Sequence, residues 1–362
     1  MKLTDRQKAV IIINRANGIG QIKTRRIISA LDDKPEVILD SLFQVRQKLL
    51  CAVSEKEYGE ICVSLQMGTE DTEKELEQKK ISLVTCLDEA YPQPLKAYED
   101  APVILYCIGD VSLLSSDCFA VVGTRYPTKY GLRVTEDFVS ELSTRFCIVS
   151  GMARGVDSIA HRACLNNFGK TIAVLGCGVD VVYPPENRGL YAEIAERGLI
   201  VSEYPPGEKV NAHNFPARNR IISGLSRGVL VTEAGEKSGT ILTINYALDQ
   251  GKDVFCVPGS IYNQASSGCN RYIKECQSRA VTDVNDIYDE IGLKKVDIKK
   301  PSALQLDVNE NAILEELTSK GELHFEELLQ VVDLTVPQLN SLLIKMESVG
   351  LITKTKHNYW SV

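Results

Sequence analysis

From Ile81 onward, short apolar segments rich in β-branched residues alternate with helical segments of about 10 to 18 residues. Six of the apolar segments have the length and composition of strands: Phe119–Val122, Cys147–Ser150, Thr171–Leu175, Leu199–Ser202, Gly228–Thr232 and Asp253–Val257. Strands that are apolar on both faces and are joined by helices predict a doubly wound parallel sheet. We therefore expect an α/β protein with a Rossmann-like core over residues 81–290.

A small helical domain is predicted over residues 1–70, where apolar residues recur at helical spacings. Within it, Asn17–Lys23 contains a Gly-Ile-Gly turn between two short helices, and Arg25 and Arg26 follow on the second helix. This pattern resembles a helix-hairpin-helix, whose turn offers backbone N–H groups to a nucleic-acid phosphate. A plain tight turn between two helices fits the same residues equally well.

The C-terminal part divides into a linker over residues 291–306 and a domain over residues 307–362. The linker lacks periodicity and carries four lysines and a proline. The domain contains three helical segments and a terminal hairpin, the arrangement of a winged helix: Asn311–Ser319, Phe325–Val332, Thr335–Ser348 and Gly350–Val362. Residues 303–362 carry four lysines against nine acidic residues, so we expect this domain to contact protein rather than DNA.

The bulk composition is that of a cytoplasmic globular protein. The 362 residues have a net charge of −7, and no apolar run approaches the roughly 20 residues of a membrane span. The N-terminal residues lack the cleavage pattern of a secretory signal. Eleven cysteines occur without any C-x-x-C spacing, which fits a reducing compartment. We expect no membrane partner.

The motifs of the common cofactors are missing. Gly123 follows a predicted strand, but no G-x-G-x-x-G begins there, and Gly176-Cys177-Gly178 lacks the third glycine. Gly235–Thr240 contains a Lys-Ser pair without the upstream glycine of a P-loop. Four histidines, none paired with a cysteine at ligand spacing, do not make a zinc site. We therefore expect neither a dinucleotide, nor ATP hydrolysis, nor a bound metal.

One helical segment carries Asp157, His161 and Cys164 at one-turn intervals. Such a trio can form a catalytic cluster, but a helix cap followed by a packed helix face explains it more simply. We favour the structural interpretation.

Arg125 lies in the glycine turn Gly123-Thr124-Arg125, at the carboxyl end of the first predicted strand of the core. In doubly wound sheets, ligands bind beyond the carboxyl ends of the strands. An arginine at this position can bind a phosphate through both arms of its guanidinium. The alternative is a structural ion pair with a carboxylate of the same rim, such as Glu233 or Glu203.

The stretch Lys209–Arg227 contains four Lys or Arg residues and no acidic residue, although the whole chain is acidic. Phe215 lies within it, close to Arg218 and Arg220. An aromatic ring beside cations fits single-stranded nucleic acid, because a base stacks on the ring while the cations bind the backbone. The alternative is a hydrophobic staple that closes on Ile221 and Ile222.

After the next predicted strand, the residues Lys237–Thr240 begin a helix. The N-terminus of a helix presents unpaired N–H groups and the positive end of the helix dipole, and it therefore favours anions. A cationic stretch followed by such a terminus predicts a phosphate-bearing ligand.

These motifs resemble those of the DNA-processing protein A family (DprA, also called Smf). The matching motifs follow one another in order over about residues 81–290. They are Tyr91–Leu95, Ala101–Tyr106, Val121–Arg125, Ser150–His161, Leu175–Asp180, Tyr183-Pro184, Ser202–Gly207, Asn214–Ser226, Glu233–Thr240 and Val257–Gly259. The regions on either side fit the family more loosely.

The resemblance implies a homodimeric protein that binds single-stranded DNA without sequence preference and catalyses no reaction. It also implies a role in competence and natural transformation, in which incoming DNA is passed to a RecA-type recombinase. The positions that the resemblance assigns to DNA contact are Gly123, Thr124, Arg125, Phe215, Arg218, Asn219, Arg220, Lys237, Ser238, Gly239 and Thr240.

An enzyme is the alternative. The lysine-decarboxylase-like nucleotide phosphoribohydrolases have a similar core and a loop of the form P-G-G-x-G-T-x-x-E. The comparable loop here lacks the leading Pro-Gly-Gly, and Thr243 stands where the glutamate is required, although Glu233 is near. We therefore prefer DNA binding over glycosidic cleavage.

Overall fold

The computed structural model describes residues 2–295, 307–348, 351–355 and 358–361. It divides into two compact units, Met1–Lys294 and Lys295–Val362, and each is described here by itself. No helix in the described ranges is long and apolar enough to span a membrane.

A nine-stranded sheet forms the centre of the first unit, with the strand order β1-β2-β6-β5-β4-β3-β7-β8-β9. All neighbours from β6 across to β9 are parallel, whereas β1 and β2 add to β6 as antiparallel strands. The strands are β1 (Ser82–Thr85), β2 (Ile104–Gly109), β3 (Cys118–Val122), β4 (Cys147–Ser150), β5 (Thr171–Val174), β6 (Leu199–Ser202), β7 (Gly228–Val231), β8 (Asp253–Cys256) and β9 (Arg279–Ala280).

The predicted α/β fold with a parallel sheet is confirmed, and the six predicted strands correspond to β3 through β8. The antiparallel edge formed by β1 and β2 is an addition that the sequence analysis missed. The alternation of strands and helices predicts only parallel neighbours, because each helix returns the chain to the same end of the sheet. The segment between β1 and β2 instead returns the chain in the opposite direction.

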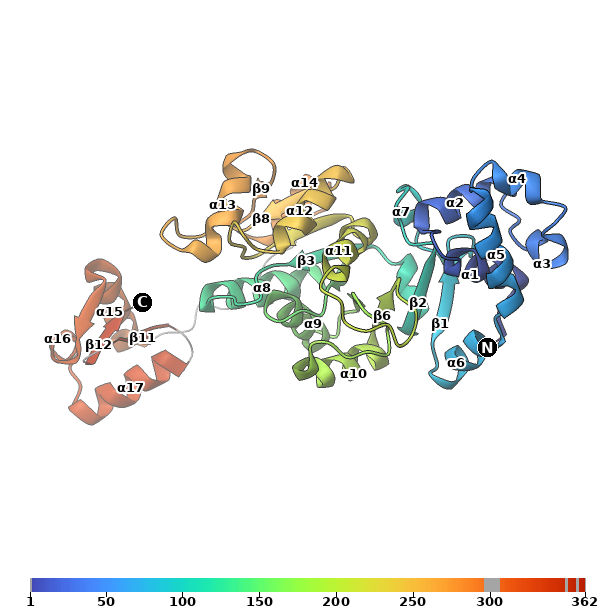
Figure 1. Cartoon of the computed structure of the whole chain (residues 1–362). Helices are drawn as coiled ribbons and strands as arrows, with labels where there is room; N and C mark the ends of the chain where they lie inside the picture. The colour runs from blue at the N-terminus through green and yellow to red at the C-terminus, as the bar shows by residue number, and fades with distance from the viewer. Residues whose placement is uncertain (1, 296–306, 349–350, 356–357, 362) are drawn as a thin grey trace. The chain divides into compact units, whose positions relative to one another are not determined.

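Helices cover both faces of this sheet (Figure 1). The alternation of side chains along a strand divides the core: Ile172 and Val174 of β5 point into one apolar cluster, and Ala173 points into the other. One face carries α8 (Lys129–Leu142), α9 (Val156–Asn166), α10 (Arg188–Arg197) and α14 (Val284–Glu290). The other carries α7 (Gln93–Lys96), α11 (Asn214–Leu225), α12 (Thr240–Asp249) and α13 (Ser267–Lys274). Short 3-10 helices occur at η1 (Val111–Ser115), η2 (Pro185–Asn187) and η3 (Gln264–Ser266).

Six helices precede the sheet: α1 (Asp5–Arg15), α2 (Gln21–Ala30), α3 (Val37–Ser41), α4 (Arg46–Leu50), α5 (Glu55–Met67) and α6 (Glu70–Gln78). Helix α1 is buried on two sides. Its Ile12 and Ile13 belong to a core of the N-terminal helices, whereas Val10 and Ile11 belong to the cluster that contains Leu83 of β1. The N-terminal helices therefore have a core of their own and also extend that of the sheet. Their division from the sheet as a domain over residues 1–70 stays a prediction.

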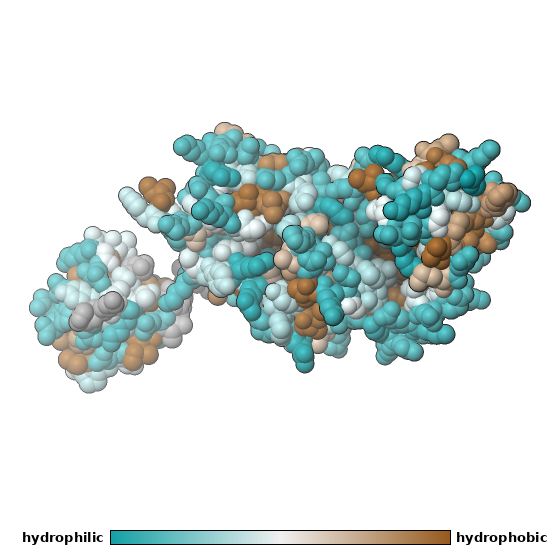
Figure 2. Space-filling model, viewed as in Figure 1, coloured by the Kyte–Doolittle hydropathy of each residue, from teal (hydrophilic) through white to brown (hydrophobic). Residues whose placement is uncertain are grey.

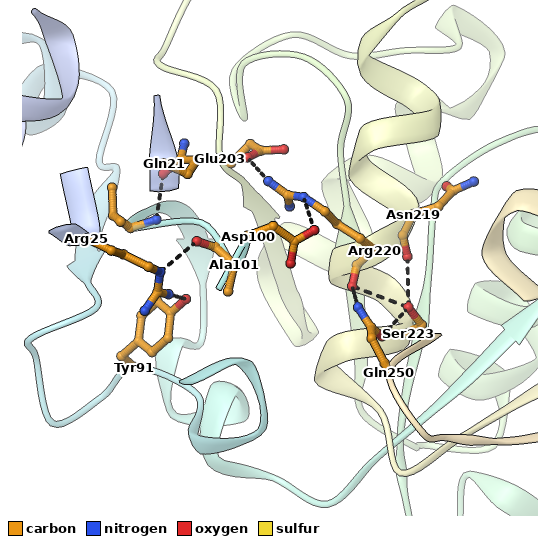
Figure 3. Close-up of polar contacts among 11 residues, drawn as sticks. Gln21, Arg25, Tyr91, Asp100, Ala101, Glu203, Asn219, Arg220, Ser223 and Gln250 are labelled. Atoms are coloured by element: carbon orange, nitrogen blue, oxygen red, sulfur yellow. Dashed lines mark hydrogen bonds and ion pairs between the residues drawn. The ribbon is translucent and has the colours of Figure 1, made fainter. Parts of the chain in front are cut away.

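The cations that follow the glycine turn between α1 and α2 are engaged within the chain. Lys23 forms an ion pair with Glu57. Arg25 donates hydrogen bonds to the carbonyl of Ala101 at 3.2 Å and to the hydroxyl of Tyr91 at 3.3 Å (Figure 3). These contacts fasten α2 to the segment before β2, so a nucleic acid at this turn would have to compete with them. The helix-hairpin-helix interpretation stays a prediction.

Among its described residues, the second unit has three helices and a small antiparallel sheet of order β10-β12-β11. Its elements are α15 (Val308–Lys320), β10 (Glu322–His324), α16 (Phe325–Val331), α17 (Val336–Ser348), β11 (Thr353–Lys354) and β12 (Tyr359–Ser361). Leu317, Leu343 and Trp360 are buried in its core. This is the predicted winged-helix-like arrangement, with β10 added to the expected hairpin. Most of the predicted linker, residues 296–306, lies outside the described residues.

Candidate functional site

A groove of about 1120 Å³ lies at the carboxyl ends of β3 and β7. The chain places β4, β5 and β6 on one side of β3 and places β7 and β8 on the other, so the strand order reverses between β3 and β7. A reversal of this kind opens a crevice beyond the strand ends, because the connecting helices leave toward opposite faces. The groove therefore lies where a doubly wound sheet binds its ligand.

Ten of the eleven residues predicted to contact DNA line this groove. They are Gly123, Thr124, Arg125, Phe215, Arg218, Asn219, Lys237, Ser238, Gly239 and Thr240. The structure brings together three segments that are far apart in the sequence: the loop after β3, the first turns of α11 and the N-terminus of α12. Arg220 is the predicted residue that the groove does not include.

The loop after β3 is shaped by the close approach of its backbone to β7. A Cβ on Gly123 would lie 2.9 Å from the carbonyl oxygen of Glu233 and 2.6 Å from a methyl group of Val156. The amide of Thr124 donates to the same Glu233 carbonyl at 2.7 Å. This contact directs the loop outward, so that Arg125 is exposed at the groove.

Arg125 forms no ion pair with any described residue. The two carboxylates considered as its partners are both engaged elsewhere. Glu233 accepts from the amide of Thr128 at 2.8 Å and from its hydroxyl at 2.7 Å. Glu203 is paired with Arg220. The structural ion pair proposed as the alternative role of Arg125 is therefore not formed.

Glu233 itself is a buried carboxylate with 1% of its surface exposed. It holds Thr128, the N-cap of α8, and thereby fixes the far end of the loop that carries Arg125. Both carboxylate oxygens are occupied by Thr128, so Glu233 is not available to replace the glutamate that the phosphoribohydrolase loop requires near Thr243.

The opposite wall is formed by the residues before α12. The side chain of Ser238 accepts a hydrogen bond at 3.2 Å from the amide of Thr240, the first residue of α12, whose N-cap is Gly239. Lys237 is exposed and, within the described part of the chain, has no ion-pair partner. Glu236 is also exposed and lines the groove beside it, which partly offsets the positive charge of this wall.

Helix α11 contributes both an aromatic ring and a buried cation. The ring of Phe215 packs against that of Tyr183, with centroids 5.4 Å apart. Ile221 and Ile222, the residues proposed for a hydrophobic staple, belong instead to the sheet core below α11. Arg218 is only 4% exposed and lies under the floor of the groove.

Arg218 donates hydrogen bonds to the Asn219 side chain and to two backbone carbonyls at the ends of β4 and β5. Its guanidinium donates to the carbonyl of Gly151 at 2.7 Å and to that of Val174. Burial lowers the pKa of Arg218, and the nearby Asp157 opposes this shift. A Cβ on Gly151 would lie 2.5 Å from the Arg218 guanidinium and 2.7 Å from the Asp157 carboxylate, so both groups flank this glycine.

Arg220 does not line the groove, and its side chain extends toward Asp100 and Glu203 (Figure 3). Its guanidinium lies 2.6 Å from the Glu203 carboxylate and 3.6 Å from that of Asp100. The last member of the acid-free stretch, Arg227, lies 3.5 Å from Asp117. The stretch Lys209–Arg227 therefore does not form one cationic face, because its arginines are buried or paired.

Asp157 and His161 have structural roles, as the sequence favoured. The Asp157 carboxylate accepts from the amides of Gly151 and Ala153 at 3.2 and 3.3 Å and so shapes the loop after β4. His161 is fully buried and is hydrogen-bonded to the Thr171 hydroxyl at 2.7 Å. Burial lowers the pKa of His161 to about 3, which keeps the ring neutral.

The sequence analysis missed two aromatic residues that line the groove, Tyr126 and Tyr183. They are 78% and 41% exposed. Tyr126 follows Arg125 directly, and Tyr183 belongs to a motif that was noted only for its resemblance to the family. Their proximity to the groove depends on the loops after β3 and β5, and periodicity does not predict loop paths.

The groove offers cations, exposed aromatic rings, a helix N-terminus and the exposed carboxylate of Glu236. Among the described residues, no three His, Cys, Asp or Glu side chains gather into a possible metal site. The carboxylates of Asp157, which lines the groove, and of Glu233, which does not, hold loops in place, whereas Glu236 lines the groove and is exposed. This arrangement can bind an extended anion that carries flat apolar groups.

Comparison with known proteins agrees with the family resemblance. The family model of DNA recombination-mediator protein A matches residues 82–292. The DNA processing protein DprA of Streptococcus pneumoniae is 43% identical over 221 residues, which cover 61% of this chain and 78% of that protein. DprA of Bacillus subtilis is 38% identical over 226 residues, which cover 62% of this chain and 76% of that protein.

Two solved structures share the fold. DprA from Streptococcus pneumoniae has a TM-score of 0.69 and 34% identity, and the match covers 82% of this chain and all of that chain. DNA processing protein A from Helicobacter pylori, described with a unique single-stranded DNA binding mode, has a TM-score of 0.54 and 32% identity. That match covers 59% of this chain and 95% of that chain.

Proposed function

Because the chain belongs to the DNA recombination-mediator protein A family, we propose that it binds single-stranded DNA in the groove between β3 and β7. Binding is independent of sequence and involves no catalysis. The Helicobacter pylori relative, with its single-stranded DNA binding mode, supports this ligand. The observation that carries the proposal is the groove itself, which places the unpaired cations Arg125 and Lys237 beside exposed aromatic rings.

The groove has groups that can bind the phosphate of a nucleotide and groups that can bind its base. Phosphates attract the Arg125 guanidinium, the Lys237 ammonium group and the N-terminus of α12, because all three are positive and accessible. Bases can stack on aromatic rings such as Phe215. Backbone contacts of this kind carry no sequence information, so the expected binding is non-specific.

We assign different roles to the predicted residues according to their burial. Arg125, Phe215, Asn219 and the segment Lys237–Thr240 are proposed to touch DNA directly. Gly123 and Thr124 set the path of the loop, and Arg218 supplies positive charge from beneath the floor. Arg220 is proposed to hold α11 in place through Glu203 rather than to contact the strand.

The proposal is tested by fluorescence anisotropy with labelled oligonucleotides. We expect similar affinity for homopolymers and mixed sequences, weaker binding to a duplex of equal length, and a steep loss of affinity as salt increases. The Phe215→Ala variant should lose roughly 1–3 kcal/mol of binding free energy if a base stacks on the ring. Absence of single-strand binding at low salt would contradict the proposal.

The absence of catalysis is proposed on chemical grounds. The phosphoribohydrolase loop carries its carboxylate at the position that Thr243 occupies here, and Glu233, the alternative, has both oxygens bound to Thr128. Incubation with nucleoside monophosphates, followed by chromatography for released base, tests this directly. Turnover that is lost in the Glu233→Gln variant would favour the phosphoribohydrolase alternative.

We further propose that the chain acts as a homodimer in natural transformation and helps to load a RecA-type recombinase onto the bound strand. Relatives named for DNA processing support this role. Light scattering gives the oligomeric state. The loading role predicts faster growth of recombinase filaments on DNA that is coated with single-strand-binding protein. If filament growth does not change when this protein is added, the loading role is wrong and DNA binding alone remains.

A further inference from the structure

Three aromatic rings line the groove, and they come from three different segments. Tyr126 lies in the loop after β3, Tyr183 lies between β5 and α10, and Phe215 lies in the first turn of α11. Tyr126 and Tyr183 are 78% and 41% exposed. Large aromatic surfaces left open to water in a groove mark a place where a flat apolar group can be buried.

The ring pair on the α11 side is held in place by the backbone beneath it. Phe215 packs on Tyr183 with an interplanar angle of 34°. A Cβ on Gly176 would lie 3.0 Å from the Phe215 ring, so the ring rests directly on the glycine backbone. The buried Asn187, four residues after Tyr183, donates to the carbonyl of Met152 at 2.9 Å and to the hydroxyl of Ser158 at 2.8 Å. Because these contacts already hold the two rings in place, a ligand that binds to them loses less free energy to ordering side chains.

The ring on the other wall is adjacent in sequence to an unpaired cation. The amide of Tyr126 donates to the Thr124 hydroxyl at 3.2 Å, which fixes the turn in which Arg125 also lies. A guanidinium and a phenol on consecutive residues can bind the phosphate and the base of neighbouring nucleotides. The second unpaired cation, Lys237, lies across the groove.

We propose that Tyr126 and Tyr183 are base-stacking residues and that each wall of the groove holds at least one unpaired nucleobase. Tyr183 and Phe215 form one platform, and Tyr126 forms the other. The inference rests on the proposed single-strand binding and specifies which part of the ligand each wall recognises. Because every base has a π face, such stacking tolerates any sequence, and a duplex is disfavoured because its bases are already stacked.

The test compares an oligothymidylate with an abasic strand of the same length and charge, using anisotropy at one salt concentration. For the wild type we expect tighter binding to the oligothymidylate. Tyr126→Ala and Tyr183→Ala should each weaken oligothymidylate binding by about 5- to 150-fold, the equivalent of 1–3 kcal/mol per stacked base, and should not change binding to the abasic strand. Tyr126→Phe and Tyr183→Phe keep the ring and should bind like the wild type.

A matched control is Phe168→Ala, which removes a ring that is 89% exposed and follows the C-terminal end of α9. This variant should bind both strands like the wild type. Tyr183→Leu keeps apolar bulk without a π face, so it should lose affinity for oligothymidylate but not for the abasic strand, and it replaces Tyr183→Ala in the test if the alanine variant folds poorly.

The inference is overturned if the Tyr→Ala variants bind oligothymidylate like the wild type. It is equally overturned if their affinity for the abasic strand falls by the same factor as their affinity for oligothymidylate, since the rings would then only support the fold. Failure of the proposed function gives a different result, in which the wild type binds neither strand.

Discussion

The guanidinium of Arg220 lies 2.6 Å from the carboxylate of Glu203, and the two side chains are only 11% and 6% exposed. Neither residue lines the groove, and Figure 3 shows the Arg220 side chain extending from its helix toward Glu203 and Asp100. Burial raises the pKa of Glu203, and Arg220 opposes this shift. Although Arg220 directly follows the groove residue Asn219 in the sequence, its role is to stabilise the fold, whereas Arg125 remains available to a ligand.

Arg220→Ala should lower the free energy of unfolding by about 3 kcal/mol, because it leaves Glu203 buried without its partner. The DNA affinity of the folded fraction should not change. Urea denaturation and anisotropy measure the two quantities. Arg46→Ala breaks an exposed pair with Glu55 and should cost less than about 1 kcal/mol. A stable Arg220→Ala variant with poor DNA binding would place Arg220 in the interface.

Gly151→Ala should destabilise the protein by about 1–3 kcal/mol, because the added Cβ would collide with Arg218 and Asp157, both of which are buried. Neither side chain can move without losing its hydrogen bonds. Gly189→Ala is a matched control in α10, where nothing lies within 4 Å of the new atom. That variant should be neutral or more stable by up to about 1 kcal/mol. Thermal unfolding gives the melting temperature of each variant. Equal melting temperatures would contradict the close packing of Arg218 and Asp157 around Gly151.

The parallel core could be predicted from the sequence because its strands are apolar throughout and are separated by helices. The ligand rim followed from the same pattern, since Gly123 comes directly after a strand and Lys237 lies in the loop between a strand and the next helix. The pairing of individual charges could not be predicted. Arg125 and Arg220 look alike in the sequence, and only the tertiary fold places Glu203 beside one of them.

Some large hydrophobic residues are exposed on the surface rather than buried in the core. Figure 2 shows hydrophobic residues gathered over part of the N-terminal helices, where Phe43, Val63 and Met67 are exposed. The alternation pattern that predicts a sheet carries no information on such positions, because their exposure depends on how the helices pack together. For the same reason, the sequence did not separate Tyr126 at the groove from other exposed aromatic residues.

Acidification should destabilise the protein through His161. Its pKa is lowered to about 3 in the folded protein, so between pH 6.5 and about 3 the unfolded chain binds a proton that the folded protein does not. The stability from this residue is present above pH 6.5 and is lost as the pH falls. Between pH 6.5 and pH 5 the loss should be about 2 kcal/mol.

Urea denaturation of the wild type and of His161→Gln at both pH values tests this expectation. The variant should be less stable overall but should show a smaller dependence on pH. An identical pH dependence in the two proteins would show that other groups dominate.

Deletion of residues 303–362 should leave single-strand affinity largely intact. Helix α17 carries one lysine, Lys345, whose ammonium group lies 2.8 Å from the Glu310 carboxylate. A helix whose cation is already paired contributes little to phosphate binding. Anisotropy on the shortened protein measures the effect, and a large loss of affinity would assign the second unit to the DNA interface.

The most direct test of the groove as the DNA site is a salt titration of single-strand binding by the wild type and by Arg125→Ala. The variant should bind every sequence more weakly by the same factor, and the slope of log K against log salt should fall by about 0.7, the value for one phosphate contact on a single strand. Arg162→Ala removes an exposed arginine of α9 that has no ion-pair partner among the described residues, and it should match the wild type. Wild-type affinity and slope in the Arg125 variant would contradict the placement of DNA in this groove.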